Sequence, residues 1–145
     1  MRYKNFHIII AAAHSFVVTA MFFPLINVNS QRIGATVSEA EPYYMNVVNY
    51  LRNEIYPLTG IFMITLMILA SLGAVNSMMG VFSKKIRPVN VKLSFILGFS
   101  EATLAALVLY SNSIALFVIC AVSFVLVSVS SIKLIRLEER LNEQK

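Results

Sequence analysis

Two polar side chains stand inside long apolar runs of this sequence and could do chemistry there. Glu101 lies in the middle of residues 91–110, VKLSFILGFSEATLAALVLY, and His14 lies within an earlier run at residues 6–28. A charged side chain at bilayer depth costs about 2.5–3.5 kcal/mol on insertion scales, so it should face protein or water rather than lipid. A histidine and a glutamate that meet in a dry interior could relay protons, bind a cation or neutralise each other.

The spacing of these two residues predicts that they lie at a similar depth. Suppose that both runs are helices that cross the membrane in the same direction. A rise of about 1.5 Å per residue then puts His14 about 12 Å from the start of its own run and Glu101 about 15 Å from the start of its own. Gly98, Ala102 and Ala105 lie near Glu101 on such a helix, so the charged face is also the small-residue face. We therefore favour a clamp between helices over an ion or proton pathway, and both over a ligand contact.

Little else in the chain suggests catalysis. Asn76 is a further polar residue at depth, and asparagine in a span usually hydrogen-bonds a neighbouring helix, so packing is favoured over pore lining. Cys120 is the single cysteine, and the sequence has neither metal-ligand spacing nor a phosphate-binding glycine loop. We expect no catalytic residues, no metal and no cofactor, and thus a protein that is not an enzyme.

Composition indicates an integral membrane protein. Of the 145 residues, 58% are hydrophobic and 13% are charged, whereas a soluble domain has about 45–50% and about 25%. Four apolar runs are long enough to span a bilayer, at 6–28, 57–82, 91–110 and 114–135. The sequence predicts one transmembrane domain over residues 1–145, an all-α four-helix bundle.

The connection at residues 29–55 is the longest, and we expect it to form an extracytoplasmic cap between the first two spans. Residues 31–38 partly alternate and carry β-branched side chains, so a short strand is left open there. Within 39–55 an apolar stripe predicts an amphipathic helix, formed by Tyr44, Val47, Val48, Leu51 and Ile55. Tyr43, Tyr44 and Tyr50 suit the headgroup zone and are candidate contacts for lipid or a partner.

Basic residues set the expected orientation. Ten of the 12 Lys and Arg residues lie at the chain start, in the turn at 83–92 or near the tail at 136–145, whereas Arg32 and Arg52 lie on the other side. The positive-inside rule predicts that both termini and the tail are cytoplasmic. Four basic residues of the turn could contact anionic lipid or a partner, namely Lys84, Lys85, Arg87 and Lys92. Because the basic residues cluster at span ends, we expect no nucleic-acid binding.

The layout of a long first outer loop, a short inner turn and a minimal outer turn at residues 111–113 resembles that of claudin-like tetraspan proteins. The resemblance is one of topology. The tryptophan and paired cysteines of their loop signature are absent, since this chain has no Trp and one Cys. The resemblance therefore implies no role for any individual residue.

These observations favour a non-enzymatic multi-pass membrane subunit or interaction (scaffold) protein, embedded among membrane lipids as a homo-oligomer or in a larger membrane complex. The alternative is a small oligomeric channel or transporter that uses Glu101, with His14, as an ion or proton site. A lipid-binding accessory protein is a third hypothesis. A hydrated cavity at Glu101 would favour transport, whereas a dry contact with His14 would favour a structural role.

Overall fold

The chain is mostly helical. The computed structural model describes residues 2–27, 44–52, 57–83, 86–109 and 113–143. Its elements in chain order are α1 (Arg2–Ala20), β1 (Ile26–Asn27), β2 (Tyr44–Met45), α2 (Val47–Arg52), α3 (Pro57–Phe82), α4 (Pro88–Val108) and α5 (Ile114–Glu143).

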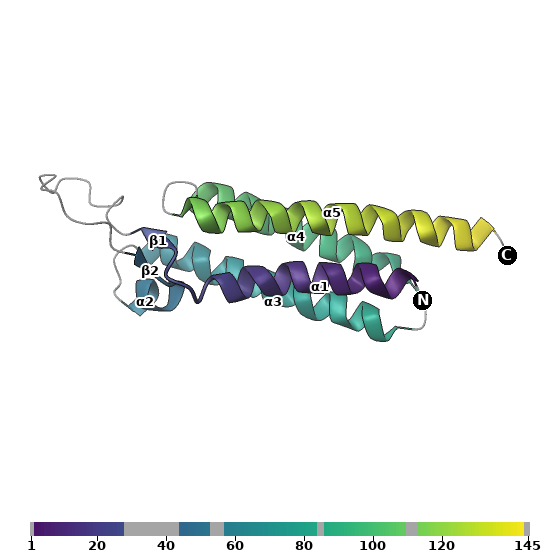
Figure 1. Ribbon diagram of the computed structural model, residues 1–145, viewed down its shortest axis with the longest axis horizontal. Helices are drawn as coiled ribbons and strands as arrows, with labels where there is room; N and C mark the ends of the chain where they lie inside the picture. The colour runs from purple at the N-terminus through teal and green to yellow at the C-terminus, as the bar shows by residue number, and fades with distance from the viewer. Residues whose placement is uncertain (1, 28–43, 53–56, 84–85, 110–112, 144–145) are drawn as a thin grey trace, which may run out of the picture.

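The long helices α1, α3, α4 and α5 lie side by side (Figure 1). Helix α1 packs against α3 and α5, and α4 packs against the same two helices, so α1 and α4 face each other diagonally. Both termini lie at one end, which we call the terminal end, while α2 and the two strands lie at the other, the strand end (Figure 1).

Three helices of the described residues are long and apolar enough to cross a membrane: Thr59–Phe82, Pro88–Val108 and Ile114–Glu143. The expected span at 57–82 coincides with α3. The expected span at 91–110 corresponds to α4, which starts three residues earlier because proline suits the first turn of a helix. The expected span at 114–135 lies within α5, which continues through the polar tail to Glu143.

The first expected span, at 6–28, ends earlier than predicted. Helix α1 ends at Ala20, and Ile26 then pairs antiparallel with Met45 across the short β1–β2 ladder. Pro24 accounts for the difference, because proline removes a backbone donor and keeps the preceding residue out of the helical conformation. Helix α1 is not among the three apolar helices, since Lys4 and two histidines lower its average hydropathy.

The connection between α1 and α3 also differs from the prediction. Within the described part of the expected 39–55 helix, Tyr44–Met45 form β2 and Val47–Arg52 form α2, and Asn46 caps the start of α2 by accepting a 2.8 Å bond from the Asn49 amide. The buried residues of α2 are Val47 and Tyr50, and Leu51 packs against the same cluster, whereas Val48 is exposed, so the side of α2 that faces the core includes only part of the predicted stripe. The possible strand at 31–38 lies outside the described residues.

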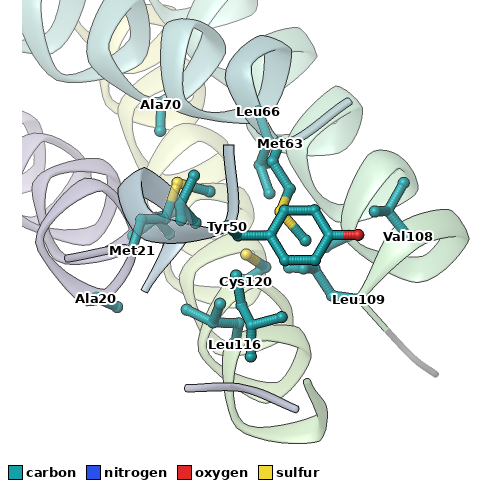
Figure 2. Packing of buried hydrophobic residues seen from close by; sticks show 14 residues of the cluster. Ala20, Met21, Tyr50, Met63, Leu66, Ala70, Val108, Leu109, Leu116 and Cys120 are labelled. Atoms are coloured by element: carbon teal, nitrogen blue, oxygen red, sulfur yellow. The ribbon is translucent and has the colours of Figure 1, made fainter. Parts of the chain in front are cut away.

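Two apolar clusters fill the interior. The cluster at the strand end gathers residues of α1, α2, α3, α4 and α5 around Tyr50, Met63 and Leu116 (Figure 2). The cluster at the terminal end is smaller and includes Ile10 and Val127.

The outer surface is apolar while several interior side chains are polar. Exposed apolar side chains occur on every long helix, among them Phe16, Ile61, Leu72, Val75, Phe99, Leu107, Val122 and Val125. Buried polar side chains include His7, His14, Asn76, Ser77, Ser94, Glu101, Ser123, Ser130 and Ser131. A water-soluble fold has the reverse arrangement, so lipid is the solvent that this surface suits.

Candidate functional site

The structure brings His14 and Glu101 together. His14 Nδ1 of α1 lies 2.7 Å from Glu101 Oε1 of α4, and the two side chains are 0% and 2% exposed. Because α1 and α4 face each other diagonally, the pair crosses the interior between α3 and α5. The similar depth predicted from the spacing is what allows this contact.

The contact between His14 and Glu101 is an ion pair by distance but not an aligned hydrogen bond. Neither His14 Nδ1 nor Glu101 Oε1 has a partner that meets hydrogen-bond geometry within the described residues. His14 Nε2 also lacks such a partner. Proximity of two buried polar groups, rather than a directional hydrogen bond, therefore joins α1 to α4 at this level.

Glycine residues of α3 make room for the two histidines of α1. A Cβ atom at Gly73 would lie 2.6 Å from Nδ1 and Cε1 of His14, too close for any real side chain, and a Cβ at Gly80 would overlap the His7 ring. Seven residues separate both the histidines and the glycines, so the antiparallel helices meet at two matched positions, two turns apart. His7 is only 1% exposed.

Helix α5 adds a serine near the level of the pair. Gly98 of α4 packs against Val127 of α5, where an added Cβ would lie 3.1 Å from Val127 Cγ1. One helical turn further along each of these antiparallel helices are Glu101 and Ser123. Ser123 is 4% exposed, and its hydroxyl has no hydrogen-bond partner in the described part of the chain.

The pair lies between the two apolar clusters. On α1, Ile10 belongs to the cluster at the terminal end and Val17 to the cluster at the strand end, with His14 between them. On α4, Val91 and Ala105 flank Glu101 in the same way. The pair thus lies between the two clusters, and its terminal side also holds buried polar side chains, among them His7 and Ser131.

Asn76 joins α3 to α4 instead of contributing to the pair. Its Nδ2 donates to the carbonyl oxygen of Asn90 at 2.8 Å and to Ser94 Oγ at 2.7 Å. The hydroxyls of Ser77 and Ser94 lie 3.0 Å apart. Interhelical hydrogen bonds of this kind hold spans together, which is the packing role favoured from the sequence.

Some of the candidate lipid or partner contacts are exposed, and others lie outside the described residues. Arg87 and Lys92 are exposed at the terminal end, and Tyr44 is 51% exposed on β2. Lys84, Lys85 and Tyr43 lie outside the described residues.

Tyr50 corrects the prediction for the tyrosines, because it is 1% exposed and belongs to the apolar cluster at the strand end. In Figure 2 its ring points across that cluster toward Val108 and Leu109. Tyrosine suits both a headgroup zone and a protein core, so composition alone could not distinguish the two.

Sequence reasoning did not single out several buried polar residues. His7, Ser77, Ser94 and Ser123 were not among the candidates, although the shared spacing of seven between histidines and glycines is a signal that could have found His7.

Within the described residues, no three His, Cys, Asp or Glu side chains gather in a way that could hold a metal ion. The chain matches no family model, no curated protein and no solved structure. Function must therefore be argued from the geometry of the site and from the surface around it.

Proposed function

We propose that α1 is a fourth membrane span, which completes a four-helix transmembrane bundle. Its 19 residues give a length of about 28 Å, close to the roughly 30 Å of a hydrocarbon core. The exposed side chains of Ile8, Ile9 and Phe16 are apolar, and His7 and His14 are buried. The two histidines face protein, and the half-buried Lys4 and exposed Asn5 lie at the start of the helix, so the rest of the surface that α1 offers to lipid suits a bilayer.

The orientation follows from the ends of the bundle. Basic residues gather at the terminal end, on α1, α4, α5 and the α3–α4 connection: Lys4, Arg87, Lys92, Lys133, Arg136 and Arg140. Arg52 is the basic residue described at the strand end. The positive-inside rule then places both termini in the cytoplasm and the strand end outside, as a cap.

Single-cysteine labelling tests this topology. In a Cys120→Ser background, we expect Val48→Cys to react with a membrane-impermeant maleimide in right-side-out vesicles. We expect Asn5→Cys and Glu139→Cys to react only after permeabilisation, because all three positions are exposed but lie at opposite ends. Labelling at positions 5 and 48 from the same side would mean that α1 does not cross.

We propose that the protein is a non-enzymatic membrane subunit or interaction protein. The observation that carries this proposal is the buried contact between His14 and Glu101, in which the Glu101 side chain is only 2% exposed and lies 2.7 Å from a histidine. Such a pair joins helices and fixes their register. The cap and the basic turn then remain as the surfaces for a partner.

The mass of the particle in native lipid tests this function. The protein is extracted with its surrounding lipid, and the mass of the particle is measured by native mass spectrometry. We expect a mass that corresponds to several copies of the 16.2 kDa chain, or to the chain and a second polypeptide in fixed ratio. A strictly monomeric particle, in lipid and at native expression level, would contradict the proposal.

A specific observation supports transport as the second candidate. Buried polar atoms without hydrogen-bond partners in the described residues occur from the terminal end to the pair, on His7, Ser131, Ser123 and His14. Ionisable and hydroxyl groups inside a span are typical of proton pathways. A chain of this size would need to form oligomers around such a path.

A further inference from the structure

A small cavity lies at the terminal end, where the start of α1 meets the last part of α5. Its volume is about 280 Å³, and its lining residues are Phe6, Lys133, Arg136, Leu137 and Arg140. Three of these five residues are basic, and none is acidic. The basic residues follow a spacing of three and four along α5, so they lie on one face of the helix.

Contacts between α1 and α5 shape the wall of this cavity. Lys133 Nζ lies 5.7 Å from the centroid of the Phe6 ring, within the range of a cation–π interaction. Phe6 in turn packs against the apolar cluster at the terminal end. An aromatic ring and Leu137 therefore supply an apolar wall beside three cations.

Among the described residues, no carboxylate forms an ion pair with the basic side chains of the cavity. Within the described residues, neither Arg136 nor Arg140 forms an ion pair, although Glu138, Glu139 and Glu143 are neighbours on the same helix. Arginine side chains that keep their charge can bind phosphate oxygens through two parallel N–H bonds.

The position of the cavity matches the depth of a lipid headgroup. Just before it on α5, Val129 and Ile132 are 46% and 47% exposed, and Ile8 and Ile9 of α1 are exposed nearby in sequence to Phe6. The apolar surface thus ends where the basic residues begin. A lipid whose tails lie along the apolar surface would bring its phosphate to this level.

We propose that this cavity binds the phosphate of an anionic phospholipid headgroup. Arg136 and Arg140 bind the phosphate oxygens, Lys133 adds charge at the edge, and Phe6 and Leu137 contact the glycerol and the first acyl carbons. The site goes beyond the proposed function and depends only on α5 crossing the membrane.

Lipid titration of the detergent-solubilised chain tests the site. Native mass spectrometry would follow binding of phosphatidylglycerol, with zwitterionic phosphatidylcholine and soluble glycerol phosphate as the comparison ligands. We expect Arg136→Gln with Arg140→Gln to weaken phosphatidylglycerol binding at least about tenfold, because two charge-assisted bonds are lost. Phosphatidylcholine should bind more weakly to the native chain, and glycerol phosphate should not bind measurably.

Lys4→Gln with Arg52→Gln is the matched control, since it removes the same number of positive charges from outside both the cavity and the basic turn at 83–92. Its affinity should stay native. An equal loss in both double variants, native affinity in the cavity variant, or equal binding of the two lipids would overturn the proposal. Tight binding of glycerol phosphate would make a soluble phosphate the ligand and overturn the lipid assignment.

Folding of each variant can be checked by protection of the buried Cys120 thiol from a maleimide dye. Should the double cavity variant lose that protection, Arg140→Gln alone gives the same comparison, because Arg140 is exposed on the last turns of α5.

Discussion

Replacing His14 by alanine should cost about 3–5 kcal/mol of folding free energy, because it leaves the buried Glu101 carboxyl group without the partner that it contacts. Glu101→Gln should cost less, about 1–3 kcal/mol, since an amide of the same size can still form hydrogen bonds. The difference follows from the burial of both side chains, which keeps water from replacing the lost partner. Unfolding in mixed micelles, followed by the reaction of Cys120 with a thiol dye, measures both values.

A double variant tests the interaction between His14 and Glu101 rather than the contribution of either side chain alone. His14→Leu with Glu101→Met replaces the ion pair by apolar side chains of similar volume, and its stability should be near native or higher. Ser15→Ala, an exposed change beside His14, is the control and should be close to neutral. If the separately measured costs of His14→Leu and Glu101→Met simply add up to the cost of the double variant, the two side chains are not coupled.

Gly73→Ala should destabilise the protein by about 1–3 kcal/mol, the typical cost of overpacking. Alanine in place of glycine within a helix normally stabilises it by up to about 1 kcal/mol, so the expected sign is reversed. The cause is the new methyl group, which would lie 2.6 Å from the His14 ring and push the imidazole away from Glu101. The same unfolding measurement reports this cost.

Gly73→Ala in a His14→Ala chain tests whether the imidazole ring causes the destabilisation. In a His14→Ala chain, Gly73→Ala should no longer destabilise, because the space of the imidazole is empty. Gly98→Ala is a milder comparison, since the nearest atom to its methyl group would be Val127 Cγ1 at 3.1 Å. The same cost at Gly73 with and without the His14 ring would exclude this explanation.

The long apolar helices were predictable from the sequence. The features that depend on packing between helices were predicted less well. The bounds of α3 follow directly from an apolar run that opens with proline and ends before a basic turn. The end of α1 was missed because residues 21–25 are as apolar as the helix before them. The burial of Tyr50 was missed because it depends on how α2 turns against α3.

The candidate site was predictable where one residue carried a large energetic cost. A carboxylate in an apolar run must find a partner, which is why Glu101 was singled out and why His14 at a matching level was considered. The matching glycine, Gly73, and the cavity beside Phe6 were not predictable in the same way. Both depend on which helices adjoin, namely α1 with α3 and α1 with α5, and the sequence does not give that order.

The most direct test of the account is flux of protons and monovalent cations through proteoliposomes containing either the native chain or Glu101→Gln. Glutamine keeps the size of the side chain and removes its titratable charge. If His14 and Glu101 are a clamp between helices, neither protein should pass ions above the level of empty liposomes, and both should keep Cys120 protected. Flux through the native chain that disappears in folded Glu101→Gln would contradict the account and make Glu101 the centre of a transport site.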